Sequence, residues 1–214
     1  MTPLCILLAD DHVMVRQGLR KLLEERPEWR VLEAGDGRDA VQQAEAHRPD
    51  VAIIDIAMPL LSGIDATRRI RTCAPLTKVL MLSMHTDDTY VADAFRAGAA
   101  GYLLKDSADV DLLRAISAVA SGRSFVSPAI ERLLLTGQAR APGEPMLDRY
   151  AMLTAREREV FQLVAESRGN KEIAARLSIS PSTVETHRAH IMEKMDLHSA
   201  ADITRYAVRR GVIT

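Results

Sequence analysis

The sequence contains only two cysteines, Cys5 and Cys73. Two isolated cysteines exclude a disulfide framework and a zinc site built from thiolates. The amino terminus lacks the basic segment, apolar stretch and cleavage site of a secretory signal. No uninterrupted apolar run approaches the roughly 20 residues that are needed to span a bilayer. We therefore expect a reduced, cytoplasmic protein with no membrane partner.

The chain also has almost no net charge, with a formal value of −1 over 214 residues. The charges are unevenly divided. Residues 148–214 carry 11 lysines and arginines against 9 acidic residues, and the remainder of the chain carries 17 lysines and arginines against 20 acidic residues. An acidic front and a mildly basic rear indicate that only the rear contacts a polyanion, although so small an imbalance does not establish nucleic-acid binding alone. The length suits two domains.

Short apolar runs alternate with longer amphipathic stretches through the front half of the chain. The runs predict strands near residues 5–9, 30–34, 51–55, 79–83 and 101–105. The stretches between and after them predict helices near residues 13–25, 37–47, 63–73, 87–97 and 109–121. This alternation is typical of a parallel sheet buried between helices. We predict an α/β fold, a doubly wound arrangement of five βα units around a five-stranded parallel sheet. The pattern stops too early for an eight-unit barrel.

Four of the apolar runs end in reactive polar residues. In chain order these residues are Asp10 and Asp11, Asp55, Ser83, and Lys105. Functional sites in such sheets form beyond the carboxyl ends of the strands, so these side chains should meet at one edge. Three carboxylates would repel one another unless a divalent cation lies among them. A small set of hard oxygen ligands suits Mg²⁺.

The same residues suit phosphoryl transfer. An aspartate can act as a nucleophile and form an acyl phosphate. Lys105 would supply positive charge to the phosphoryl oxygens. Ser83 would hydrogen-bond an oxygen that exists only after transfer, which makes it a plausible switch. Each residue alone is better explained as a strand end that faces water, but the agreement of four strands favours a site.

The motifs around these residues resemble bacterial response-regulator receiver domains. The matching segments are LADDH at residues 8–12, DIAMP at residues 55–59 followed by Gly63, and GYLLKD at residues 101–106. The resemblance implies that Asp55 is the phosphoacceptor and that a partner sensor histidine kinase donates the phosphoryl group. Receivers often have a proline after the lysine, whereas this chain has Asp106. The subfamily with a helical DNA-binding output often lacks that proline.

The resemblance also implies a role for each site residue. Asp11 would bind Mg²⁺ directly and Asp10 would act through water. Tyr102 would be the aromatic side chain that swings inward when Ser83 moves. The implied metal set is Asp10, Asp11, Asp55 and the backbone carbonyl of Ala57. The implied phosphoryl-contact and switch set is Ser83, Tyr102 and Lys105.

A segment without hydrophobic period separates the front from the rear. Residues 129–135 suit a short helix, and residues 136–145 (TGQARAPGEP) are rich in helix breakers. We read the latter as a mobile connection. We expect a receiver domain at residues 1–125, a linker at 126–147 and a second domain at 148–214.

The rear reads as helix throughout. Thr154 and Glu157 form a capping-box pattern, and a last helix is expected from Ser199 to before Gly211. Between them, a short helix at 170–177, a tight turn and a longer helix at about 182–195 have the architecture of a helix-turn-helix. The apolar seam between these two helices would comprise Ile173, Ala174, Leu177, Ile179, Val184 and Ile191. Any small helical bundle needs such a seam.

Longer motifs in the rear resemble the LuxR-type output domain. They are LTAREREV at 153–160, GNKEIA at 169–174 and SPSTVETH at 180–187. Joined to a receiver, this domain resembles a response regulator of the NarL/FixJ family. The resemblance implies a small all-α helix-turn-helix domain that binds double-stranded promoter DNA, as a homodimer when phosphorylated. The last helix would be the dimerisation helix, although core packing explains it equally well.

The resemblance places a DNA-contact set on both helices, with Lys171 on the shorter helix and the other residues on the longer one. Glu185, Thr186 and Ala189 would face base edges, and phosphate contacts would fix the register without reading sequence. Many relatives have lysine in place of Glu185, and a carboxylate there could accept a hydrogen bond from cytosine N4. His187 could contact the DNA backbone or pack. The complete set is Lys171, Ser182, Thr183, Glu185, Thr186, His187, Arg188 and Ala189.

Two other functions deserve comparison with a phosphorylation-switched regulator. A magnesium-dependent phosphatase usually needs a second acid close after its nucleophile, and residues 56–59 contain none. A DNA binder whose receiver serves only as a scaffold would not need the complete acidic set with Lys105. We therefore expect a transcription factor and not an enzyme.

Overall fold

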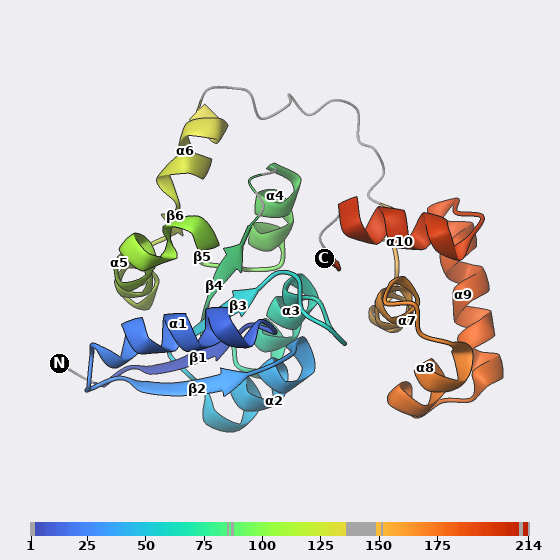
Figure 1. The fold of residues 1–214 in the computed structure, drawn as a ribbon, viewed down its shortest axis with the longest axis horizontal. Helices are drawn as coiled ribbons and strands as arrows, with labels where there is room; N and C mark the ends of the chain where they lie inside the picture. The colour runs from blue at the N-terminus through green and yellow to red at the C-terminus, as the bar shows by residue number, and fades with distance from the viewer. Residues whose placement is uncertain are drawn as a thin grey trace. The chain divides into compact units, whose positions relative to one another are not determined.

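A computed structural model describes residues 3–84, 86, 88–135, 149–150, 152–209 and 212–213. The chain divides into two compact units, Met1–Ala141 and Pro142–Thr214 (Figure 1). Residues 136–148, which make up most of the expected linker, lie outside the described residues. Among the helices that the structure describes, none is long and apolar enough to cross a membrane.

The first unit is a parallel sheet between two layers of helices. Its strands are β1 (Cys5–Ala9), β2 (Arg30–Ala34), β3 (Val51–Asp55), β4 (Lys78–Ser83), β5 (Gly101–Leu104) and β6 (Phe125–Val126). Its helices are α1 (Val13–Glu24), α2 (Gly37–His47), α3 (Gly63–Cys73), α4 (Asp88–Arg96), the short 3₁₀ helix η1 (Lys105–Ser107), α5 (Ala108–Ala120) and α6 (Pro128–Leu135). The predicted fold class is confirmed.

The strands lie in the order β2-β1-β3-β4-β5-β6, and every pairing is parallel. The order reverses between β1 and β3, which is where open sheets of this kind bind their ligands. One face of the sheet packs on α1 and α5 around Leu8, Ile53 and Leu112. The other face packs on α2, α3 and α4 around Ile54, Ile70 and Ala94.

The sheet has one strand more than the five that we expected, and the segment after it is not linker. Val126 belongs to β6, which pairs with β5. Residues 128–135 form α6, whose Ile130 is buried in the core cluster that contains Tyr102. β6 and α6 therefore belong to the first unit, and they fall in the segment that the sequence pattern assigned to the linker. A two-residue strand gives no hydrophobic period to detect, so the sequence pattern could not reveal it.

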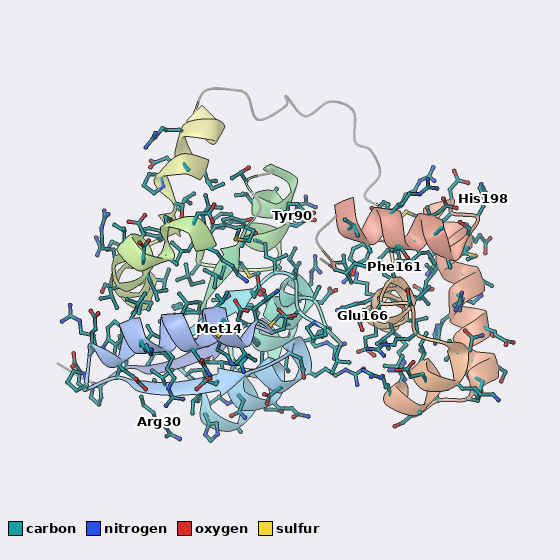
Figure 2. The ribbon with its side chains drawn as sticks, viewed as in Figure 1. Met14, Arg30, Tyr90, Phe161, Glu166 and His198 are labelled. Carbon is teal, nitrogen blue, oxygen red and sulfur yellow. The ribbon has the colours of Figure 1, made fainter. Side chains whose placement is uncertain are left out.

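The second unit is entirely helical over its described residues. It comprises α7 (Ala155–Ala165), α8 (Asn170–Leu177), α9 (Pro181–Met195) and α10 (Ala200–Arg209). Thr154 and Glu157 form the predicted capping box at the start of α7. Ser180 caps α9, with Pro181 at its first position. Figure 2 labels Phe161, whose ring meets Tyr206 of α10 edge-on at 6.0 Å between centroids.

The predicted seam of the helix-turn-helix lies inside this second unit. Five of its six residues are buried, and Ile179 in the turn is half-buried. The turn between α8 and α9 contains Ser178 in the left-handed backbone region, with φ of 54°. The apolar seam fixes the angle between the two helices, so the polar side of α9 is left exposed.

Candidate functional site

Three of the predicted site residues meet at the carboxyl edge of the sheet. Asp10 follows β1, Asp55 ends β3 and Lys105 follows β5. Lys105 Nζ lies 2.8 Å from Asp10 Oδ2 and 2.9 Å from Asp55 Oδ2. Both aspartates are buried, with 0% and 3% of their surface exposed. One ammonium therefore bridges two carboxylates that come from neighbouring strands.

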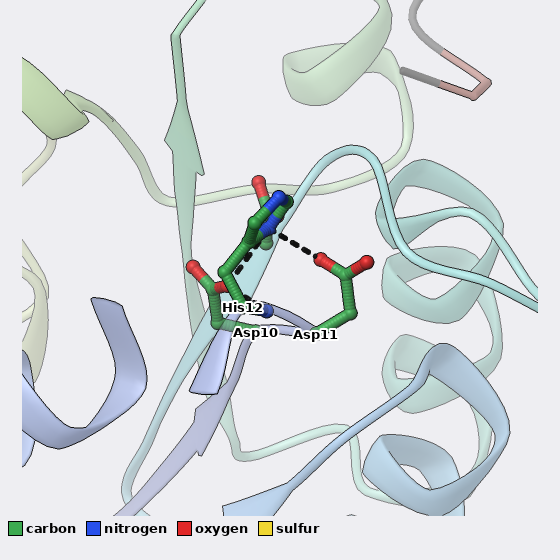
Figure 3. Close-up of side chains that lie close together, drawn as sticks. Asp10, Asp11 and His12 are labelled. Atoms are coloured by element: carbon green, nitrogen blue, oxygen red, sulfur yellow. Dashed lines mark hydrogen bonds and ion pairs between the residues drawn. The ribbon is translucent and has the colours of Figure 1, made fainter. Parts of the chain in front are cut away.

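Asp11 and His12 complete the acidic edge on the solvent side. Figure 3 shows the three consecutive side chains Asp10, Asp11 and His12 grouped together. His12 Nδ1 lies 2.8 Å from Asp11 Oδ1 and 3.5 Å from Asp10 Oδ1. The backbone amide of His12 donates to Asp10 Oδ1 at 2.8 Å. The turn after β1 thus orients the Asp10 carboxylate through its own backbone.

The electrostatics of the edge are set by burial and by the short distances between charges. Burial raises the pKa of Asp55 to about 6, with Asp10 adding to the rise and the Lys105 charge opposing it. Burial would lower the pKa of Lys105, but the charges of Asp55 and Asp10 raise it above its ordinary value. Lys105 is therefore charged near neutral pH, and burial keeps the pKa of Asp55 above its ordinary value of 3.8 in spite of that charge.

The donor set of the edge fits a divalent cation. Ligand atoms of Asp10, Asp11, His12 and Asp55 all lie within 4.8 Å of one another. Lys105 Nζ lies 2.8 Å from Asp10 Oδ2 and His12 Nδ1 lies 2.8 Å from Asp11 Oδ1, but one ammonium does not offset three carboxylates held so close together. Like charges at this distance repel one another unless a further cation lies among them. The residues present therefore fit a hard cation.

Ser83 and Ala57 lie at this edge, whereas Tyr102 lies farther back in β5, where it pairs with Met81. Ser83 is buried at the end of β4, where Leu82 pairs with Asp55 in the register. Tyr102 is fully buried in the cluster that also contains Tyr90 of α4, labelled in Figure 2. Its ring already occupies the interior in this structure. Ala57 is half-buried in the connection from β3 to α3.

The structure adds two residues that the sequence reasoning did not assign. His12 is one, although it stands in the LADDH motif. Arg16 of α1 is the other: its Nη1 donates to the backbone carbonyl of Asp10 at 2.5 Å, and its Nε donates to Glu33 at 3.1 Å. Arg16 thereby ties the start of α1 to the end of β1. An arginine one turn into a helix gives no signal in the sequence pattern that distinguishes it from a solvated residue.

The residues of the expected DNA-contact set lie on α8 and α9, outside the apolar seam. Most are exposed, and His187 and Arg188 are half-buried. Arg188 Nη1 donates to Asn170 Oδ1 at 2.9 Å, and Asn170 Nδ2 donates to Glu185 Oε1 at 3.3 Å. Asn170 of α8 therefore links a basic and an acidic side chain of α9. Spacing in the sequence did not predict this link.

The comparisons with known proteins match both units. Residues 6–117 match the response regulator receiver domain, and residues 151–207 match the luxR family of bacterial regulatory proteins. The oxygen regulatory protein NreC of Staphylococcus carnosus is 37% identical over 217 residues, which cover 97% of this chain and 98% of that protein.

Solved structures agree with these matches. A LuxR-family two-component response regulator from Aurantimonas sp. SI85-9A1 has a TM-score of 0.61 and 36% identity, and covers 64% of this chain and 99% of its own. The RcsB response regulator in complex with DNA has a TM-score of 0.59 and 25% identity, and covers 99% of this chain and 100% of its own. The chain belongs to the NarL/FixJ family of two-component response regulators, which are transcription regulators with a receiver domain and a LuxR-type helix-turn-helix domain.

Proposed function

We propose that this protein is a transcription regulator whose DNA binding is switched by phosphorylation of Asp55. The observation that carries the proposal is the buried trio of Asp10, Asp55 and Lys105, with Nζ within 2.9 Å of both carboxylates. A buried carboxylate beside a fixed ammonium is suited to nucleophilic attack on phosphorus, because the ammonium stabilises the charge that develops on the phosphoryl oxygens.

The donor is a phosphohistidine of a partner sensor histidine kinase, as the family implies. An oxygen of Asp55 attacks the phosphorus, the P–N bond breaks and an acyl phosphate forms on Asp55. Lys105 then exchanges part of its contact with Asp55 for a phosphoryl oxygen. The backbone amide of His12 and the guanidinium of Arg16 hold Asp10 in place during this exchange.

Mg²⁺ is the proposed cofactor of this step. The carboxylates of Asp11 and Asp55 and the carbonyl of Ala57 would hold it, with Asp10 acting through water. When bound, the ion neutralises charge on the phosphoryl oxygens. The crowding of three carboxylates within 4.8 Å supports a cation here. Magnesium suits the site because it accepts few protein ligands and retains water.

The switch follows from the buried hydroxyl at the end of β4. Ser83 would move to donate a hydrogen bond to the phosphoryl group. This movement would leave room for the ring of Tyr102 in the interior, so the inward position of the ring would be favoured. The complete burial of Tyr102 beside the α4 cluster supports this route. The signal would leave the receiver through α4 and β5.

The output is sequence-specific binding to double-stranded DNA by α9. Glu185, Thr186 and Ala189 read base edges, while Lys171, Ser182, Thr183 and Arg188 contact phosphates, with His187 at the rim. Two copies in a homodimer present α9 helices to half-sites about one helical turn apart. The receiver domain of this proposal spans residues 1–125 extended by β6 and α6, and the DNA-binding domain spans residues 148–214.

Labelling with radioactive acetyl phosphate tests the acceptor. The variant D55N should take up no label, because an amide is not a nucleophile toward phosphorus. The matched control D106N changes an exposed aspartate beside Lys105 and should be labelled like the unmodified chain. Stoichiometric labelling of D55N would overturn the assignment of Asp55. DNA affinity that does not change on labelling would instead favour a receiver that serves only as a scaffold.

A further inference from the structure

Leu104 is the residue before Lys105. Its backbone amide donates to a side chain, although at this position of the sheet a backbone carbonyl of the neighbouring strand would be the expected acceptor. β6 pairs with β5 through Gly101 with Phe125 and Tyr102 with Val126, and then it ends. The amide of Ser127 still donates to the carbonyl of Tyr102 at 2.9 Å. In a regular parallel ladder, the amide of Leu104 would next donate to the carbonyl of Ser127. In this structure it donates to the Ser127 hydroxyl at 2.9 Å.

The reason lies in the first turn of α6. The Ser127 carbonyl accepts from the amides of Ile130 and Glu131 at 2.9 and 3.1 Å. It is therefore engaged by the helix, and the hydroxyl takes its place in the ladder. Ser127 is 1% exposed and Leu104 is 7% exposed, so water does not readily replace this bond. One residue thus joins the end of β5 to the beginning of α6.

A second serine holds the other side of the same residue. Ser107 Oγ donates to the carbonyl of Leu104 at 3.3 Å and lies 3.4 Å from Ser127 Oγ. Leu104 is therefore fixed through both its amide and its carbonyl. The next residue is Lys105, whose ammonium bridges Asp10 and Asp55. A displacement of the Lys105 backbone on phosphorylation would strain these bonds, because Leu104 and Lys105 share a peptide group.

The segment on the far side of Ser127 leads out of the receiver. α6 buries Ile130 in the cluster that contains Tyr102, and it is the last described element before residues 136–148. We propose that Ser127 is a positioning residue that couples the state of the Asp55 site to α6 through the Leu104 amide. This inference rests on the proposed function and names how that site is read out.

Hydrogen exchange of the full chain, followed by mass spectrometry with and without beryllofluoride and Mg²⁺, tests the coupling. In the unmodified chain, the phosphoryl mimic should change exchange at residues 56–62 and shift the rates of α6 amides by at least about threefold. In S127A, the response at residues 56–62 should remain and the α6 response should be lost. The matched control S117A removes an exposed hydroxyl of α5 that donates to Leu113. It should respond like the unmodified chain.

A second variant covers the case in which S127A does not fold. S127C has a similar volume and a weaker acceptor, so its α6 response should be reduced in part. The coupling would be overturned if the α6 response in either variant were as large as in the original sequence. It would also be overturned if the original sequence responded at residues 56–62 but not in α6. If the protein with its original sequence shows no response at residues 56–62 and takes up no label from acetyl phosphate, the proposed function fails and the coupling fails with it.

Discussion

Lys194 of α9 and the buried Glu157 of α7 form an ion pair in which Nζ lies 2.7 Å from each carboxylate oxygen. The same carboxylate accepts from the amide of Thr154 at 2.7 Å. Glu157 is only 3% exposed. One side chain therefore caps α7 and anchors the carboxyl-terminal part of the helix that we propose to read DNA.

The variant E157Q should destabilise the helical unit. An amide can still accept from Thr154, but it leaves the Lys194 ammonium without its counter-charge, so we expect a loss of about 1–2 kcal/mol in the free energy of unfolding. The control E172Q removes an exposed carboxylate that pairs with Arg168 and Arg176. It should cost less than about 0.5 kcal/mol. Native-state hydrogen exchange in α7 and α9 measures both, and equal losses would contradict the anchoring role.

The stability of the helical unit should also depend on pH through Glu157. Burial would raise the pKa of its carboxyl, but the Lys194 ammonium and the Thr154 donors together hold it below the ordinary value of 4.5. A depressed pKa means that the stabilisation is complete above pH 4.5 and is lost as the pH falls through the folded-state pKa. Exchange rates corrected for the intrinsic rate at each pH should show this decline. In E157Q the stability of the helical unit should change less with pH. An unchanged pH dependence in E157Q would exclude Glu157 as the cause of the decline.

The sequence predicted the strands and the acidic edge because both depend on local patterns. Apolar runs identify buried strands, and parallel strands bring their carboxyl ends to the same edge of the sheet. The contacts inside the helical unit between residues far apart in the sequence were not predictable in this way. Glu157 was identified as part of a capping box, but its bond to Lys194 joins residues 37 positions apart and depends on the packing of α7 against α9. The link from Asn170 to Arg188 has the same origin.

The ionisation of Asp55 should respond in opposite directions to its two neighbours. Burial raises its pKa to about 6, Lys105 lowers it and Asp10 raises it. K105M should therefore raise the pKa above about 6, and D10N should lower it. Carbon-13 NMR of the aspartate carboxyls in Mg²⁺-free protein measures the midpoint. Added Mg²⁺ should move the midpoint of the unmodified chain to lower pH, because a cation favours the carboxylate. Shifts of the same sign in both variants would contradict this account.

Two substitutions on the DNA-contact set should have different signatures. K171A would remove the phosphate contact that we propose for Lys171, so it should weaken binding to all sequences alike and reduce the slope of log affinity against log salt by about 1. E185Q should change base preference at one position of each half-site by about 1–3 kcal/mol. Binding-site selection followed by salt titration distinguishes these outcomes. A uniform loss in E185Q would mean that Glu185 does not read a base and acts instead through its bond with Asn170.

Gly63 sets how closely α3 approaches β3, the strand that carries the proposed phosphoacceptor Asp55. A Cβ atom there would lie 1.9 Å from the carbonyl oxygen and 2.8 Å from the carbonyl carbon of Asp55. Because both are backbone atoms, G63A must displace the start of α3 or the end of β3. We expect a loss of about 3 kcal/mol in the stability of the first unit and slower labelling of Asp55.

The control for this substitution is G35A, because nothing lies within 4 Å of a Cβ at Gly35. Its stability should stay within about 0.5 kcal/mol of the unmodified chain. Denaturant unfolding followed by fluorescence reports on the first unit alone, since Trp29 is the single tryptophan of the chain. Equal stability of G63A and G35A would show that the connection from β3 to α3 can yield without cost. Asp55 would then be less rigidly held than the close contact at Gly63 indicates.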